Sequence, residues 1–173
     1  MARAFISVPL DEQTQELLLR LDRRQADVNW VHPEKWHVTM QFFGAVDLDD
    51  LRDCFEKIEA FQATGTLGPR ITRLGDRNLV VPVRGLSELA DNVRKSTSRL
   101  APKQELPFVG HITLGRTKGD VVPEIVGTTI KGNFRVDRLM LIKSVIGSAG
   151  AAHTVVDSRS LIPMDVSAHS NDI

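Results

Sequence analysis

The chain has 173 residues, 42% of them hydrophobic and 25% charged, and its 22 basic side chains balance its 22 acidic ones. This length suffices for one domain with its own core. A net charge of zero argues against a protein that holds long nucleic acids by bulk attraction, but it leaves room for an enzyme that grips one nucleotide or one RNA end. No apolar run reaches the roughly 20 residues of a membrane-spanning helix, and the first ten residues lack the features of a signal peptide. The single cysteine, Cys54, cannot form an internal disulfide, so we expect core packing for Cys54 and a cytoplasmic location for the protein.

The first half of the chain predicts two strands and two helices. Residues 4–8 suit a strand that Pro9 ends, and leucines among charges indicate an amphipathic helix from Asp11 to about Val28. Residues 36–43 alternate as a strand does, and Gly44 marks the end. Asp47 can then cap a helix, because the apolar positions that follow keep helical spacing. These positions are Leu51, Cys54, Phe55, Ile58 and Phe61.

The second half predicts more strand than helix. Residues 62–77 are expected to form a loop with a short strand, and residues 117–133 a loop with a helical turn. Further strands are expected at 78–84, 108–116, 134–144 and 154–161, with one helix over 86–100. Strands that follow one another without intervening helices favour an α+β protein with antiparallel sheets. We expect one domain over residues 1–163, and a frayed tail over 164–173.

One small pattern occurs twice. His37-Val38-Thr39-Met40 and His111-Ile112-Thr113-Leu114 both read His-apolar-Thr-apolar, and both fall on predicted strands. Side chains on a strand alternate between faces, so each His points the same way as its Thr. The apolar partners can then pack into the core while both His-Thr pairs face one cleft. A lone His-x-Thr is more simply a structural histidine bonded to a hydroxyl, but the matched pair favours a catalytic interpretation.

Such a pair suits the cleavage of a phosphodiester. In-line displacement needs one proton removed from the attacking oxygen and one delivered to the leaving oxygen. Histidine can do either at neutral pH, because its ordinary pKa lies near 6.5. The hydroxyls of Thr39 and Thr113 can donate to the non-bridging oxygens, where negative charge builds up. This set needs no metal and no other cofactor. The residues alone do not decide which histidine is the acid.

Two longer segments resemble a known family. Trp30-Val31-His32-Pro33-Glu34-Lys35-Trp36-His37-Val38-Thr39-Met40-Gln41-Phe42-Phe43-Gly44 is similar to the first motif region of the two-histidine phosphoesterases, in particular the RNA 2′,3′-cyclic phosphodiesterase (2′-5′ RNA ligase-like) branch. The segment Phe108-Val109-Gly110-His111-Ile112-Thr113-Leu114-Gly115-Arg116 resembles the second motif. Residues 141–144 and 150–156 resemble the C-terminal hairpin, so the likeness spans about residues 3–162. Gly110 stands where the family usually has proline, and His153 where the hairpin often carries tyrosine.

The resemblance implies a bilobal α+β fold, with antiparallel sheets flanked by helices around a central cleft. It implies hydrolysis of a 2′,3′-cyclic phosphate at an RNA or nucleotide end to a 2′-phosphomonoester. By the same analogy His37 is the proton donor to the leaving 3′ oxygen, and His111 is the base that activates water. We expect a monomer whose partners are these substrates. The competing hypothesis is a nucleotide- or RNA-binding module on the same fold, without turnover.

Other candidates are weaker. Arg116 could contact the phosphate or a base, but strict alternation from His111 puts Arg116 on the wrong face unless the strand bulges. Phe42 is a possible substrate contact, although core packing is the simpler expectation for it. His32, His153 and His169 are expected to be surface or loop residues.

Overall fold

The computed structural model describes residues 1–103 and 106–164, and the predicted tail beyond Met164 lies outside the described residues. The first half of the chain forms β1 (Ala2–Pro9), α1 (Glu12–Leu19), β2 (Val28–Trp30), the short 3-10 helix η1 (Pro33–Lys35), β3 (His37–Val46) and α2 (Leu48–Phe55). The second half forms β4 (Ala63–Leu67), β5 (Thr72–Leu74), β6 (Asn78–Arg84), α3 (Ser87–Ser96), β7 (His111–Thr117), β8 (Gly132–Val136), β9 (Arg138–Gly147) and β10 (Gly150–Ser160).

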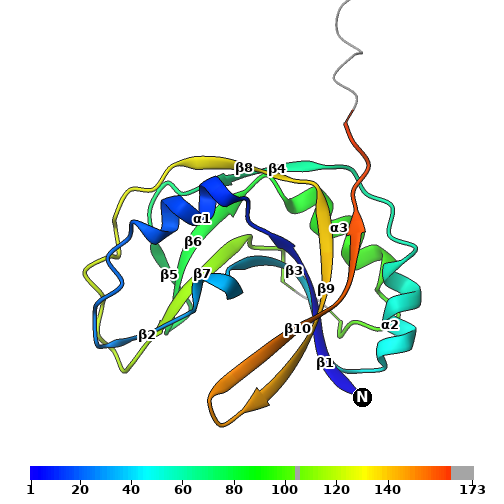
Figure 1. The fold of residues 1–173 in the computed structure, drawn as a ribbon, viewed down its shortest axis with the longest axis horizontal. Helices are drawn as coiled ribbons and strands as arrows, with labels where there is room; N and C mark the ends of the chain where they lie inside the picture. Colours follow the sequence, from blue (N-terminus) through cyan, green and yellow to red (C-terminus); the bar gives the residue numbers. More distant parts are fainter. Residues whose placement is uncertain (104–105, 165–173) are drawn as a thin grey trace, which may run out of the picture.

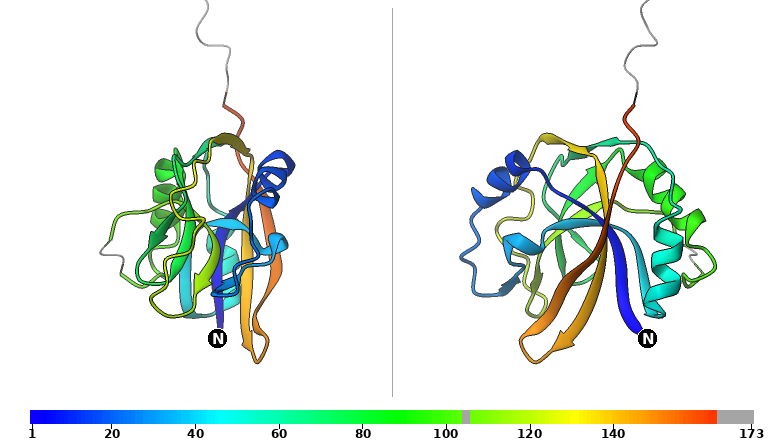
Figure 2. Two further views of the ribbon diagram at one scale, coloured as in Figure 1. Left: turned by 90° about the vertical axis from the view of Figure 1, so that its left-hand side faces the viewer. Right: turned by 45° about the vertical axis from the view of Figure 1, so that its right-hand side comes forward.

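The strands form one strongly curved sheet whose two halves meet at its centre (Figure 1). The order is β10-β9-β1-β3-β7-β6-β4-β8, with β2 added at β7 and β5 at β6. The first half of the sheet consists of β10, β9, β1 and β3, and the second half of β7, β6, β4 and β8. Each half places one predicted motif strand, β3 or β7, at the boundary between the halves, which we call the seam. The left view of Figure 2 shows the half with β1, β9 and β10 on one side and the half with β6 and β7 on the other. The antiparallel α+β architecture expected from the sequence is confirmed.

Three helices cover the sheet among the described residues, and side-chain caps start two of them. The backbone N–H of Thr14 donates to the Asp11 carboxylate at 2.8 Å, and those of Asp49 and Asp50 donate to Asp47 at 3.0 and 3.1 Å. Capping satisfies backbone donors that the first helical turn leaves free. Helix α3 packs against β3, and α1 packs against β8. None of the helices within the described residues is long and apolar enough to cross a membrane.

The predicted ends of the first two helices are wrong. The first helix ends at Leu19 instead of near Val28, because Val28 pairs with Thr117 as part of β2. Helix α2 ends at Phe55; Ile58 is still buried at 2% exposure, whereas Phe61 is 57% exposed. The apolar spacing extends beyond the helix to Ile58 because the connection that follows the helix is buried at this residue.

The segment predicted as one strand over 134–144 is two strands. It breaks at Asp137, whose carbonyl oxygen accepts from the backbone N–H of Leu161 at 2.8 Å. β8 pairs with β4 in the second half of the sheet, and β9 pairs with β1 and β10 in the first half. The chain therefore crosses between the halves at this residue. A single polar residue between two apolar runs gives little sign of such a crossing.

Candidate active site

A short turn and a backbone carbonyl orient His37. Pro33 starts η1, and the backbone N–H of Trp36 donates to the Pro33 carbonyl at 3.1 Å, so β3 begins directly at His37. Nδ1 of His37 lies 2.7 Å from the carbonyl oxygen of Lys35. A carbonyl can only accept, so Nδ1 carries a proton and Nε2 is the atom free to exchange one. Nε2 lies 3.1 Å from Oγ1 of Thr39, which donates to it while the ring is neutral.

His111 is held in the same way. Its Nδ1 lies 2.7 Å from the carbonyl oxygen of Val109, two residues earlier, just as His37 uses Lys35. Nε2 is again the atom left free for chemistry. The two copies of the motif therefore repeat in structure what they repeat in sequence: a carbonyl anchor at i−2 and an apolar residue buried at i+1.

The two motif strands meet at one residue pair. Val38 lies opposite Ile112, and both side chains are fully buried at 0% exposure. Since neighbours on a strand face opposite sides, the His and Thr of each motif face away from that core, and all four are only partly buried. His37 and Thr39 flank Val38 on β3, and His111 and Thr113 flank Ile112 on β7, so the four side chains border the same pair. The structure thus brings together the four residues that the motifs predict.

A bulge in each motif strand adds one more residue to the same face. In β7 the register with β6 shifts between the pairs Leu79–Gly115 and Val80–Thr113. Leu114 and Gly115 are consequently both buried, and Arg116 returns to the face of His111 and Thr113. Nε of Arg116 donates to the side-chain oxygen of Asn78 at 3.1 Å.

The bulge in β3 does the same for Phe42. The register with β1 shifts between Ile6 and Ser7, and both Met40 and Gln41 are buried. Phe42 is then 41% exposed on the face of His37 and Thr39, opposite Phe5 on β1. The guanidinium of Arg3 lies 5.4 Å from the centre of its ring. The expectation that Phe42 packs in the core is wrong: Phe42 is exposed on the face of His37 and Thr39, which leaves it available as a substrate contact.

A pocket of about 280 Å³ adjoins His37. Most of its lining is apolar and comes from β1, β9, β10 and Trp36; its polar members include Lys35 and His153. His153 is partly buried here, so the expectation of a surface or loop residue is wrong for it. His32 is exposed as expected, and His169 lies outside the described residues. The sequence motifs did not associate Phe5, Lys35 or His153 with His37; the alternation along β10, which pairs with β9, was the signal that could have placed His153.

Burial is the main influence on the charge of His37. It lowers the pKa of His37 from 6.5 to about 4. The hydrogen bond to the Lys35 carbonyl raises the pKa, and the charges of His153 and His111 lower it further. In the ligand-free site His37 is therefore neutral at pH 7.

Potential metal ligands do not gather elsewhere. Among residues 1–103 and 106–164, no three His, Cys, Asp or Glu side chains are placed to share a metal ion.

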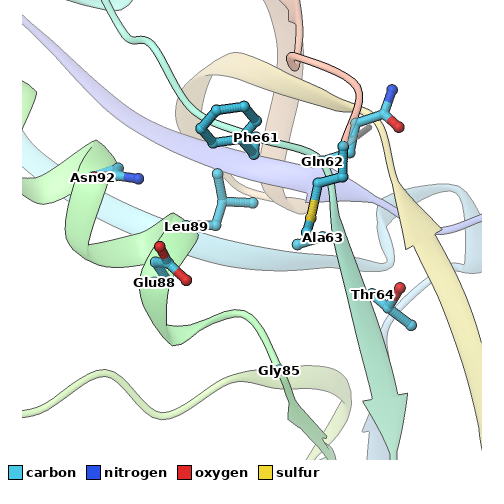
Figure 3. A pocket seen from close by; sticks show the side chains of 9 residues that line it. Phe61, Gln62, Ala63, Thr64, Gly85, Glu88, Leu89 and Asn92 are labelled. Atoms are coloured by element: carbon cyan, nitrogen blue, oxygen red, sulfur yellow. The ribbon is translucent and has the colours of Figure 1, made fainter. Parts of the chain in front are cut away.

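Cys54 is a free thiol at 6% exposure, which confirms its expected place in the core. A second hollow, of about 400 Å³ between α3 and the start of β4, contains no histidine (Figure 3). Glu88 is its one ionisable lining residue, so this hollow lacks a proton-transfer pair.

Comparisons with known proteins agree with this geometry. Residues 6–66 match the family model for LigT-like phosphoesterases. The chain is 29% identical to the RNA 2′,3′-cyclic phosphodiesterase of Methanothermobacter thermautotrophicus over 88% of this chain and 95% of that protein. It is 26% identical to the enzyme of the same name from Aquifex aeolicus, over 91% and 96%.

Solved structures share the fold. A phosphoesterase crystal structure superposes with a TM-score of 0.78 at 22% identity, covering 92% of this chain and 98% of the other. Escherichia coli LigT complexed with 3′-AMP gives a TM-score of 0.73 at 22% identity, with the same coverage. The chain has the α+β fold of these phosphoesterase structures. Over most of its length the chain is thus similar to LigT-like phosphoesterases, and residues 6–66 match their family model.

Proposed function

We propose that this protein is an RNA 2′,3′-cyclic phosphodiesterase that opens the cyclic phosphate to a 2′-phosphomonoester by paired-histidine acid–base catalysis. The observation that carries the proposal is the seam of β3 and β7. There, two histidines with carbonyl-anchored Nδ1 atoms share one face with two threonines. Several relatives that match most of the chain carry this activity in their names.

The reaction needs two proton transfers. Nε2 of His111 takes a proton from water, and the water oxygen forms a bond to phosphorus. The bond from phosphorus to the 3′ oxygen breaks, and Nε2 of His37 delivers its proton to that oxygen. Thr39 and Thr113 donate hydrogen bonds to the non-bridging oxygens as charge builds there. The product carries a free 3′ hydroxyl and a 2′-phosphate.

The lowered pKa of His37 sets a condition on this assignment. A ring that is neutral at pH 7 cannot donate a proton until its pKa rises. An anionic phosphodiester bound beside the ring favours the imidazolium, because an opposite charge stabilises the protonated form. His37 thus becomes an acid when substrate is present, and the resemblance to the family supports this direction over the reverse.

The test is hydrolysis of the four 2′,3′-cyclic mononucleotides and of a short RNA with a cyclic-phosphate end, each with excess EDTA. We expect turnover that survives the chelator and a 2′-phosphate product in phosphorus NMR. His37→Ala and His111→Ala should each lower kcat by about 10²–10⁴-fold. His32→Ala is the matched control, because His32 is exposed outside the pocket.

Each alternative has its own outcome. Binding of these ligands without turnover would replace the enzyme by a nucleotide-binding module. Turnover lost to EDTA and restored by one divalent ion would refute the metal-free mechanism. A product with mainly 3′-phosphate would reverse the roles of the two histidines.

A further inference from the structure

Three aromatic rings form a cluster at the mouth of the His37 pocket. The rings of Phe5 and His37 stack with 4.8 Å between centroids and 20° between planes. His153 stands edge-on to both, 5.1 Å from Phe5 and 5.9 Å from His37, at 73° and 70°. Each ring of this Phe5–His37–His153 cluster therefore contacts the other two, and a change of the His153 ring is felt directly at His37.

The hairpin of β9 and β10 delivers His153 to this place. His153 lies opposite Ser144 on β9, which in turn lies opposite Arg3 on β1. Two residues earlier, the carbonyl of Ala151 accepts a hydrogen bond from Nζ of Lys35 at 2.8 Å. The carbonyl of the same lysine anchors Nδ1 of His37. Lys35 thus ties the strand of His153 to the backbone that orients His37.

The charges around the two rings come from few groups. Glu34 and Lys35 of η1 are the charged residues that line the pocket, and His111 on β7 acts on His37 from across the seam. The residues that β1 and β9 contribute to the lining are uncharged. Burial first, and then Lys35, lower the pKa of His153. His153 is among the groups that lower the pKa of His37.

We propose that His153 is a positioning residue for His37: its ring fixes the plane of the His37 imidazole, and its positive charge, when present, opposes protonation of His37. This inference concerns the proton donor named above and so rests on the proposed function. Two rings at this separation titrate as a coupled pair, so each proton bound by one disfavours a proton on the other. The tyrosine common at this position in the family would pack similarly but could not carry a positive charge. In this chain, His153 can therefore gain or lose a positive charge beside the proposed acid, His37.

The experiment follows the ring signals of His37 by NMR through a pH titration of the substrate-free protein. His153→Phe keeps a ring in the cluster and removes the charge, and His153→Gln removes the charge without adding bulk. Thr154→Val is the matched control, because Thr154 is the next residue of β10 and is exposed opposite Lys143. We expect the titration midpoint of His37 to rise in both His153 variants and to stay in place in the control.

The pH profile of kcat/KM provides the second readout. The limb of this profile that depends on the protonation of His37 should move to higher pH in His153→Phe, a change that simple loss of packing would not cause. A His37 midpoint that moves no further in either His153 variant than in Thr154→Val would overturn the inference. The NMR titration needs no turnover, so an inactive wild-type protein with the expected shifts would refute the proposed function and leave the coupling standing.

Discussion

At the level of single residues, two backbone carbonyls determine the tautomer and the orientation of the two motif histidines. Lys35 and Val109 each accept a hydrogen bond from Nδ1 of a motif histidine at 2.7 Å. This arrangement selects one tautomer for both neutral rings and directs both Nε2 atoms away from the backbone. The anchor comes from residue i−2 in both motifs, so it is built into the strand entrance and does not depend on a distant side chain.

The lowered pKa of His37 should be visible in the stability of the protein. The folded pKa is about 4 against an ordinary value of 6.5, so the unfolded chain binds this proton more readily. The resulting stability is fully present above pH 6.5 and is lost as pH falls towards 4. The loss amounts to about 3 kcal/mol at most. Urea unfolding at pH 7 and pH 4 should therefore show a smaller acid loss in His37→Gln than in wild type. Equal losses in the two proteins would contradict the shift.

The threonines should matter less than the histidines. Thr39→Val and Thr113→Val keep the shape of the strand but remove the hydroxyl. If each hydroxyl makes one hydrogen bond to a charged oxygen in the transition state, the loss is about 1.5–3 kcal/mol, or roughly 10- to 150-fold in kcat/KM. Thr66→Val, on β4 in the second half of the sheet, is the matched control. No loss in either motif variant would remove the hydroxyls from the mechanism.

At the scale of elements, the two bulges show what the sequence could and could not predict. Alternation along β3 and β7 correctly put His37 and Thr39 on one face, and His111 and Thr113 likewise. It failed at the fifth residue after each histidine, because an extra buried residue in each strand reverses the alternation. Arg116 and Phe42 reach the cleft face for this reason. A bulge depends on how a strand pairs with its neighbour, and one strand's sequence does not contain that information.

The same limit applies to the elements outside the motifs. The cap at Asp47 was predictable because a carboxylate and the helix it starts are adjacent in sequence. The pairing of Val28 with Thr117 was not, because 89 positions separate two residues that become neighbours only in the folded sheet. The cluster of Phe5, His37 and His153 likewise joins three strands from both ends of the chain. Local chemistry was predictable from the sequence, and contacts between distant strands were not.

A glycine in β7 allows β2 to pack closely against it. A side chain at Gly115 would place its Cβ 2.7 Å from Cγ1 of Val28 and 2.9 Å from the carbonyl oxygen of Asn29. Gly115→Ala should therefore push β2 away from β7 and cost about 1–3 kcal/mol in the free energy of unfolding, measured in urea. Gly44→Ala on β3 is the matched control, because its Cβ would meet nothing within 4 Å. Equal stability of the two variants would mean that β2 adapts without cost.

At the scale of the whole molecule, the two halves of the sheet make one site only because they meet at one seam. Each half contributes a complete His-x-Thr strand, but a single histidine can serve only one of the two proton transfers. The one registered pair between β3 and β7, Val38 with Ile112, therefore sets the spacing of His37 and His111, the proposed acid and base. Substitution of both histidines should cost less than the product of the single losses, because the two groups act in one step.

A packing change at the seam should distinguish itself from one elsewhere in the core by its effect on kcat/KM and not by its effect on the free energy of unfolding. Ile112→Val and Ile71→Val each remove one methylene from a side chain at 0% and 1% exposure. Each should lower the free energy of unfolding by about 0.5–1.5 kcal/mol in urea titrations. Of these two residues only Ile112 belongs to the registered pair, and small displacements of reacting groups carry large rate penalties. Ile112→Val should therefore lower kcat/KM by up to about tenfold, and Ile71→Val should leave it unchanged. Equal effects of the two variants on kcat/KM would mean that the spacing of the histidines does not depend on packing at the seam.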